Sequence, residues 1–371
     1  MSTLENEVIA SKRQNEAHIL LGIFAIATFF RLWNIHWGLP DILEEATPYT
    51  TSWKFWNWGK DGIDLNPHFF HYPALTFYIH FIVQGLHYLI GHIFGVYSSL
   101  DAFQKACQSN PTNFVILARM VTVTFDLGTI YITYLIGRQI LNNTAGLFAG
   151  FLLAISPLHI RESHLVNVDI ALTFFSALSL FFILQTYYKE EKKYFFLSGI
   201  GIGLASASKF TGAVLFVVLW GIQIVKTLSQ GKGIRNIFRA ELFFAGLTAS
   251  LIFVLFNPYI ILDYKNFLVD FSFEQQHMSY GHFGLDENIT SGEYYFLDAL
   301  PGSLGWVFFC AIAFSTAYLV FKKRIEVYVI FLRNCILDKR TLILYIVDVK
   351  NIRIPDHETN NAYRPASQIW R

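Results

Sequence analysis

The polar stretch at residues 156–169 is the feature that most limits how this chain can fold. It contains two histidines, an arginine, a glutamate and an aspartate, and it lies between two apolar runs long enough to cross a lipid bilayer. An ionisable side chain near the bilayer centre costs roughly 3 kcal/mol, so such residues lie at an interface or take part in function. A second polar island, residues 39–45, follows the first apolar run. The fold therefore depends on whether both islands face the same side of a membrane.

The composition is typical of a membrane protein. Of the 371 residues, 54% are hydrophobic and only 15% are charged, which is more apolar surface than a soluble domain of this length can bury. The net charge of +1 and the lack of a basic patch exclude nucleic acid as a partner. The three cysteines are scattered, without the spacing of a zinc site. We therefore expect an all-α polytopic membrane protein that contacts the lipid bilayer.

A membrane helix needs roughly 20 apolar residues. On this basis we predict spans near residues 18–34, 114–137, 145–160, 169–188, 194–209, 211–226, 240–257 and 304–321. The first run lacks a small-residue cleavage site, so it is interpreted as a retained helix that follows a cytoplasmic N-terminus, residues 1–17. The membrane domain then covers residues 18–322. Charged residues interrupt the apolar run beyond it, so residues 323–371 are expected to form an atypical tail.

The run from Tyr72 to Tyr97 decides the topology, because it carries three histidines and a glutamine among its aromatic residues. If this run crosses the membrane, the two polar islands face opposite sides. If it lies in the interface as an amphipathic helix, the lysine and arginine clusters between the other spans all become cytoplasmic, as the positive-inside rule requires. We therefore expect outer loops at residues 35–113, 159–168 and 258–303, with acids, histidines and tyrosines concentrated on that face.

The acidic pair Glu44 and Glu45 follows the first span in a segment that Pro40 and Pro48 keep irregular. A carboxylate beside apolar surface has a raised pKa and can act as a general base. The alternative is that both are solvated loop acids, and Asp41 is a nearby competitor.

His164 and Asp169 stand at the start of the 169–188 helix, where an acid in the first turn is favoured by the helix dipole and can simply cap the helix. The functional interpretation rests on their neighbours His159, Arg161 and Glu162, since capping needs only one such residue. Two histidine pairs elsewhere lack a third ligand, so no metal site is predicted at His68/His71 or His277/His282.

Lys209 lies between two apolar runs, at what this topology makes the outer surface. A lysine there either extends its ammonium group to the interface or holds an anion such as a lipid phosphate. Arg31 and Arg119, near outer helix ends, allow the same two interpretations.

The order of these features resembles family 39-like glycosyltransferases of the GT-C fold, which are relatives of protein O-mannosyltransferases and of the lipid A aminoarabinose transferase. The resemblance covers about residues 20–322. It rests on the acidic pair, on Ala118-Arg119, on the His164/Asp169 stretch, and on the segments Asn66-Pro67-His68-Phe69-Phe70-His71-Tyr72-Pro73, Lys209-Phe210-Thr211-Gly212, Asn257-Pro258-Tyr259 and Gly281-His282-Phe283-Gly284.

The resemblance implies a hexosyl or pentosyl transferase in the plasma (inner) membrane, with its active site facing the periplasm or exterior. Its donor would be a polyprenyl-phosphate-linked sugar, and its acceptor a hydroxyl of a protein, lipid or glycan. Glu45 or Glu44 would accept the proton of the acceptor, although relatives usually carry an Asp-Glu pair there. His164 and Asp169 would position the acceptor or a divalent ion, and no other cofactor is implied.

For substrate binding, the resemblance implies a set that combines cations with residues of the outer loops: Lys209, Arg161, Arg119, His71, Tyr72 and His282. Relatives normally continue with further membrane helices, so a truncated, inactive member is one alternative. The other is a transporter, for which ionisable residues near the membrane midplane are expected; Asp126, in the middle of the 114–137 helix, favours it most.

Overall fold

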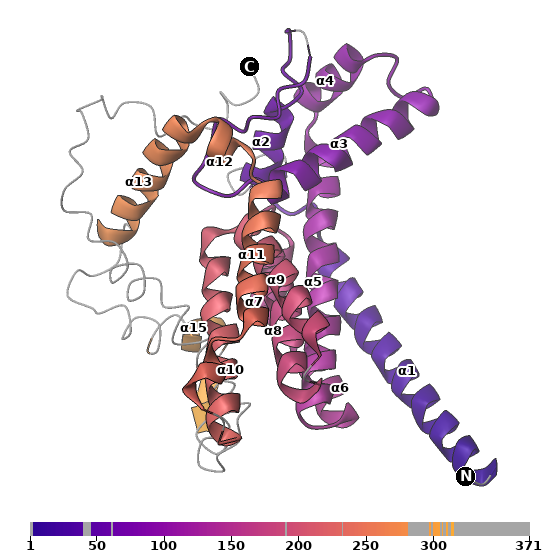
Figure 1. The fold of residues 1–371 in the computed structure, drawn as a ribbon. Helices are drawn as coiled ribbons and strands as arrows, with labels where there is room; N and C mark the ends of the chain where they lie inside the picture. The colour runs from indigo at the N-terminus through magenta and orange to yellow at the C-terminus, as the bar shows by residue number, and fades with distance from the viewer. Residues whose placement is uncertain are drawn as a thin grey trace.

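The computed structural model describes residues 3–39, 46–60, 62–189, 191–231, 233–280 and several positions between 297 and 314. Within these ranges every regular element is a helix, so the prediction of an all-α fold is confirmed. The long helices form an upright bundle, and shorter helices gather at one of its ends (Figure 1).

The bundle alternates in direction along the chain. Helix α1 (Thr3–Leu32) leads toward the end that carries the short helices, and α5 (Thr112–Ile140) returns from it. The other upright helices of the bundle are α6 (Asn143–Ala154), α8 (Asp169–Lys189), α9 (Lys192–Ser208), α10 (Leu215–Ser229) and α11 (Ala240–Leu255). Each connection that follows α1, α6, α9 and α11 is therefore at the same end, which we call the loop end.

The core of the bundle lies between α8, α9, α10 and α11, where Ile183, Ile202 and Leu219 are fully buried. Small residues let these helices approach closely. A Cβ atom on Gly199 or Gly203 of α9 would meet the carbonyl oxygens of Ala245 and Ala249 on α11, at 2.5 and 2.7 Å. This spacing of small residues four apart is a common helix-packing device in membranes.

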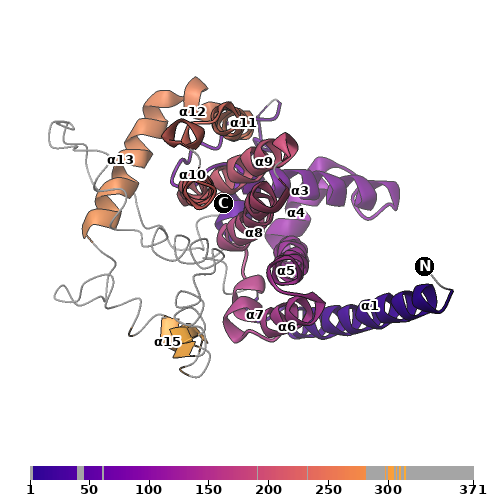
Figure 2. The same cartoon turned by 60° about the horizontal axis from the view of Figure 1, so that its bottom comes forward.

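Helix α1 is less enclosed than the others, and its N-terminal end stands away from the bundle in both views (Figures 1 and 2). Only 17% of the apolar part of this helix, within Ala10–Leu32, is buried inside the protein, as expected for a helix whose outer side faces lipid. Near its C-terminal end, Ile23 and Ala27 pack with Ile130 of α5 and Ala154 of α6.

Four described helical segments are long and apolar enough to cross a membrane: Ala10–Leu32, Thr112–Ile140, Asp169–Lys189 and Phe210–Ser229. A fifth would consist of α6 and α7 (Pro157–Ser163), which meet at an angle of 59°. We predicted one continuous span over 145–160. Pro157 explains the break, because proline has no backbone N–H to donate and its ring clashes with a carbonyl of the preceding helical turn. Helices α9 and α11 form where predicted, but with 17 and 16 residues they have fewer than the roughly 20 of a full span. Most of 304–321 lies outside the described residues.

Helices α2 (Thr47–Lys54), α3 (Leu75–Ile93) and α4 (Leu100–Ser109) lie at the loop end. One hydrophobic cluster joins Trp53, before α3, with Phe103 and Phe114, after it; the ring centroids of Trp53 and Phe103 are 5.5 Å apart. A helix that crossed a bilayer would separate its two flanks by roughly 30 Å. Helix α3 therefore enters and leaves at the loop end.

Two further helices, α12 (Tyr259–Leu262) and α13 (Tyr264–Tyr280), follow α11 at the loop end, and α13 extends sideways from the bundle (Figures 1 and 2). The smaller elements are the 3-10 turns η1 (Phe210–Val214) and η2 (Ile234–Ile237) and the short α15 (Leu300–Leu304).

Candidate functional site

Asp169 is the first residue of α8, but it does not cap that helix. The side-chain oxygen of Asn167 accepts hydrogen bonds from the backbone amides of Asp169 and Ile170, at 3.0 and 3.3 Å. The carboxylate of Asp169 instead contacts the ammonium group of Lys209, with 2.6 Å between Oδ1 and Nζ. Asn167 therefore caps the helix in place of Asp169, which lies in the first turn and directs its carboxylate to Lys209 at the loop end.

Lys209 lies at the corner between α9 and η1, in extended backbone conformation. The corner is tight because Gly212 packs on the end of α9: a Cβ atom there would meet the backbone of Ala205 at 2.3 Å. The Lys209 side chain is 13% exposed, whereas that of Asp169 is 54% exposed. The ion pair therefore has a sheltered cation and a carboxylate that water reaches.

The ring of Tyr72 lies beside this ion pair, with the Lys209 ammonium 5.8 Å from its centroid. This distance is typical of a cation–π contact. Burial raises the pKa of the Tyr72 phenol, and the positive charge of Lys209 opposes that shift. Three segments far apart in the sequence, at residues 72, 169 and 209, thus meet at one place.

His71 contacts α13 rather than the ion pair. Its Nδ1 atom is 2.8 Å from Oε1 of Glu274, and its Nε2 atom is 4.0 Å from Oδ1 of Asp270. The hydrogen bond to Glu274 raises the pKa of His71, and partial burial opposes the shift. The sequence reasoning missed both acids, although their spacing of four residues places them on one face of a helix.

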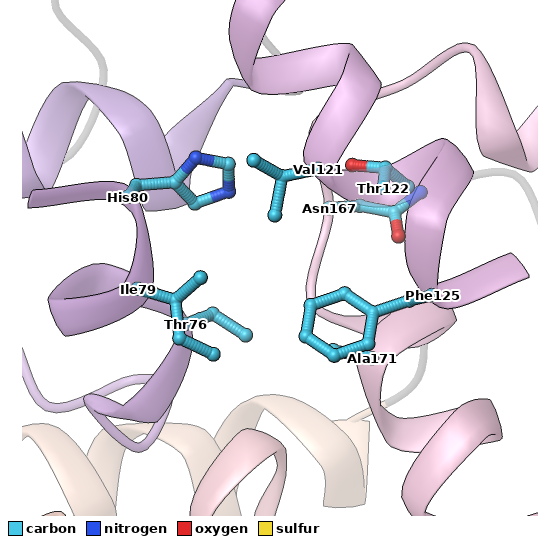
Figure 3. Close-up of a pocket in the computed structure, with 8 residues that line it drawn as sticks. All are labelled: Thr76, Ile79, His80, Val121, Thr122, Phe125, Asn167 and Ala171. Atoms are coloured by element: carbon cyan, nitrogen blue, oxygen red, sulfur yellow. The ribbon is translucent and has the colours of Figure 1, made fainter. Parts of the chain in front are cut away.

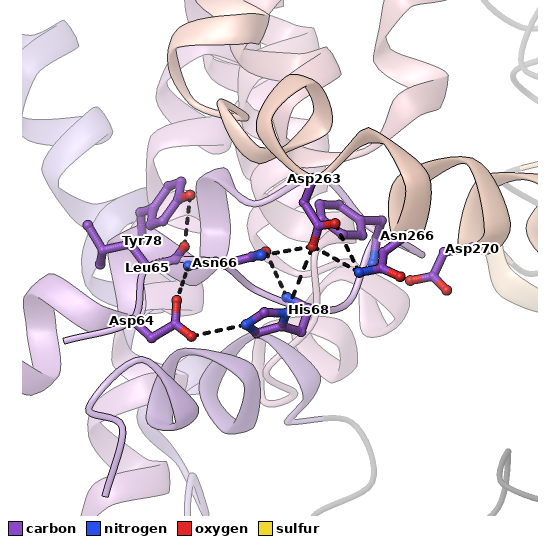
Figure 4. A network of polar contacts seen from close by, with 9 residues as sticks. Asp64, Leu65, Asn66, His68, Tyr78, Asp263, Asn266 and Asp270 are labelled. Atoms are coloured by element: carbon purple, nitrogen blue, oxygen red, sulfur yellow. Dashed lines mark hydrogen bonds and ion pairs between the residues drawn. The ribbon is translucent and has the colours of Figure 1, made fainter. Parts of the chain in front are cut away.

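Further hydrogen bonds fasten the loop before α3 to α13 and to the residues on either side of α12. Asn66 donates to Asp263 at 2.8 Å, the backbone amide of Phe70 donates to Asp270 at 2.7 Å, and the amide of Ala74 donates to Asn257 at 2.6 Å. Figure 4 shows the part of this network around Asn66 and Asp263. We call the contacts of Asp263, Asp270 and Glu274 with residues 66–71 the α13 clasp.

His164 and Arg119 lie elsewhere at the loop end. His164 contacts the backbone of Phe30 and Arg31 near the end of α1, and burial lowers its pKa. The guanidinium of Arg119 is fully buried and donates to the carbonyl oxygens of Ile35 and Trp37, at 2.7 and 2.8 Å. These contacts hold the turn that follows α1 against α5.

Arg161 is exposed on α7, with 71% of its side chain accessible, and it pairs with its neighbour Glu162 at 2.8 Å. A cation in this position is free to reorient toward a ligand. Glu44, Glu45 and His282 lie outside the described residues. Ala46, which directly follows Glu45, belongs to the same hydrophobic cluster as Val166 between His164 and Asp169.

Asp126, the residue that most favours a transporter, is fully buried in a contact between helices. Its carboxylate forms an ion pair with Arg31 of α1 and also contacts His159 of α7. Arg31 donates as well to the carbonyl oxygen of Ala154, at the end of α6. These partners give Asp126 a structural role.

A small pocket lies between α3, α5 and the start of α8 (Figure 3). Its polar lining includes Thr76, His80, Thr122 and Asn167, and the buried hydroxyl of Thr76 has no hydrogen-bond partner in the described part of the chain. Asp169, Lys209 and Tyr72 do not line it. In the described ranges no group of three or more His, Cys, Asp or Glu side chains is arranged to hold a metal ion.

Residues 112–261 match the family model of the dolichyl-phosphate-mannose-protein mannosyltransferases. This segment runs from the start of α5 to α12 and carries His164, Asp169 and Lys209. Over these residues the chain is similar to this glycosyltransferase family. The resemblance to GT-C glycosyltransferases is thereby confirmed, and the helices identify a multi-pass membrane protein.

Solved structures of an archaeal oligosaccharyltransferase from Archaeoglobus fulgidus are also similar. One is AglB in complex with an inhibitory peptide and a dolichol-phosphate, with 16% identity and a TM-score of 0.49 over 87% of this chain and 38% of that one. The other, a complex with Zn and sulfate, has 17% identity and a TM-score of 0.48 over 85% and 45%. The chain thus spans less than half the length of these structures. None of the curated proteins compared with this chain matches it.

Proposed function

We propose that this protein transfers a sugar from a polyprenyl-phosphate-linked donor to an acceptor hydroxyl on the outer face of the plasma (inner) membrane. The observation that carries the proposal is that Lys209, Asp169 and Tyr72 meet at the loop end of the bundle. The family model that matches this part of the chain is named for a dolichyl-phosphate-linked sugar, which supports a donor of this class. The acceptor is a protein, lipid or glycan hydroxyl.

Lys209 is the proposed ligand of the donor phosphate. Its ammonium has three donors, and Asp169 is sufficiently exposed to yield its place to a phosphate oxygen. As the bond from the sugar to the phosphate breaks, negative charge grows on the departing polyprenyl phosphate, and a fixed cation stabilises it. The exposed Arg161 is the proposed second cation. Arg119 we assign instead to holding the turn after α1, because its guanidinium contacts two backbone carbonyls there.

The proposed reaction is a direct displacement at the anomeric carbon. Glu45 or Glu44 accepts the proton of the acceptor hydroxyl, whose oxygen forms the new bond to the sugar. The shared cluster of Ala46 and Val166 supports a place for this acidic pair near the 164–169 stretch. His164 and Asp169 position the acceptor or a divalent ion.

Binding of the donor phosphate tests this proposal. The full chain, purified in lipid nanodiscs, is titrated with a polyprenyl phosphate that carries no sugar. We expect Lys209→Ala to weaken binding about tenfold or more, because a hydrogen bond between charged groups is lost. The matched control is Lys192→Ala, since Lys192 is 85% exposed and lies at the opposite end of the bundle.

Equal binding by the wild-type protein and Lys209→Ala would contradict the proposed role of Lys209. A transfer assay with a polyprenyl-phosphate sugar then separates an active transferase from a member that binds its donor but transfers nothing. Replacement of Glu44 and Glu45 by Gln, one at a time, should abolish transfer at the position that acts as the base while leaving phosphate binding unchanged.

A further inference from the structure

Helix α13 contacts both segments that form the proposed phosphate site. Its acids Asp270 and Glu274 hold the loop that carries Tyr72. Its rings Phe267 and Phe271 pack on Phe210, with centroids 6.3 and 5.5 Å apart, and Phe210 directly follows Lys209. Helix α13 is therefore placed to set the distance between the Tyr72 ring and the Lys209 ammonium.

We propose that Asp270 and Glu274 are positioning residues, which fasten His71 to α13 and thereby hold the Tyr72 ring against the Lys209 ammonium. The inference rests on the proposed function, because it concerns the same phosphate site. Neither acid touches the donor. Their effect on donor binding passes through His71 and the residue next to it.

The geometry separates these acids from a simple surface contact. The side chains of His71, Asp270 and Glu274 are each about one quarter exposed, at 24, 25 and 24%. Charged hydrogen bonds in such half-buried sites are stronger than those on an open surface. The ring of His71 also contacts Phe273 of α13 and Phe69 of its own loop, with centroids 5.4 and 4.8 Å apart. Helix α13 thus contacts the imidazole both through its two carboxylates and through the ring of Phe273.

The α13 clasp is expected to depend on pH through His71. The groups that shift the pKa of His71 are Glu274, by its hydrogen bond and charge, and Asp270, by its charge; burial acts in the opposite direction. Because the pKa of His71 is raised by the clasp, the clasp contributes fully below the ordinary histidine value of about 6.5. Its contribution is lost as the pH rises through the raised pKa of His71.

A substitution that keeps the positive charge at all working pH values isolates this effect. In His71→Lys the ammonium remains protonated between the two carboxylates up to about pH 9. The phosphate of the ligand itself titrates near pH 6, but this titration is common to both proteins and cancels in the ratio of their dissociation constants.

The experiment measures binding of a sugar-free polyprenyl phosphate to the full chain in nanodiscs from pH 5.5 to 9. We expect the ratio of the wild-type dissociation constant to that of His71→Lys to stay constant below pH 6 and to rise about tenfold by pH 9, since the wild-type protein alone loses the charged contact. The dissociation constant of Glu274→Gln, again divided by that of His71→Lys, should begin to rise at a lower pH, because the group that raises the pKa of His71 is removed. Asp270→Asn should shift the profile in the same direction by a smaller amount, since 4.0 Å separates Oδ1 of Asp270 from Nε2 of His71.

A ratio that stays flat across the whole pH range, or a Glu274→Gln variant with the wild-type profile, overturns the positioning role. If His71→Lys fails to fold, the pH profile of Glu274→Gln is compared directly with that of the wild-type protein, and the same difference is expected. Failure of the proposed function gives a different result: Lys209→Ala then binds polyprenyl phosphate as well as the wild-type protein does, whatever the profiles of the α13 variants.

Discussion

The ionisable residues of this chain differ in how they are compensated. Asp126 and Arg31 are fully buried and face each other, whereas Asp169 and Lys209 pair where one partner is half exposed. A buried charge that loses its partner is left uncompensated in a low-dielectric interior, and an exposed one is solvated by water. The first pair therefore serves the fold, and the second can exchange its partner for a ligand.

Removal of one member of the buried pair should destabilise the protein severely. We expect Asp126→Leu to lower the free energy of unfolding by about 3–5 kcal/mol, because the Arg31 guanidinium remains buried without its carboxylate. The double variant Arg31→Met with Asp126→Leu should lose much less, since both charges of the Arg31–Asp126 pair are removed together. Thermal unfolding in detergent measures both. Equal losses in the single and double variants would contradict this account of the pair.

At the scale of elements, the lengths of the apolar runs predicted the positions of the long helices well. Runs such as those of α5 and α8 can satisfy their backbone groups in lipid only as helices, so length and composition suffice. The same reasoning could not find the α13 clasp. His71 and Glu274 are 203 residues apart, and no local pattern records which loop a helix will meet. The break between α6 and α7 was available from Pro157 and was missed because the apolar run continues past it.

Close packing of α9 on α11 gives the prediction at this scale. Gly203→Ala should destabilise the bundle by about 1–3 kcal/mol, because the added methyl group would meet the Ala249 carbonyl and the Ile252 side chain, both at 2.7 Å. The matched control is Gly85→Ala on α3, where nothing lies within 4 Å of the added atom and the helix propensity improves. Unfolding in the same detergent should therefore separate the two variants. A similar loss in both would indicate that helix packing does not decide the effect.

For the whole molecule, the described parts of the proposed site lie at the loop end. The first loop, the start of α8, the corner at Lys209 and the α13 clasp are joined by direct contacts, so they share one side of any membrane that the bundle crosses. The distribution of lysine and arginine in the sequence predicted that this side is the outer one. Contacts between loops show only which segments lie together, so orientation requires a separate measurement.

Cysteine labelling from one side of the membrane provides that measurement. Val96 after α3 and Leu262 in α12 are 68% and 73% exposed at the loop end, and Lys192 is 85% exposed at the opposite end. In a background with Cys310 and Cys335 replaced by serine, a membrane-impermeant maleimide added to intact cells should label Val96→Cys and Leu262→Cys. Lys192→Cys should react only after the membrane is opened, because a charged reagent cannot cross the hydrocarbon core. The reverse pattern would place the loop end in the cytoplasm, where an outer-face transferase could not work. Labelling of Val96→Cys and Leu262→Cys from opposite sides would mean that α3 crosses the membrane. That result would contradict the packing of its two flanks in one cluster.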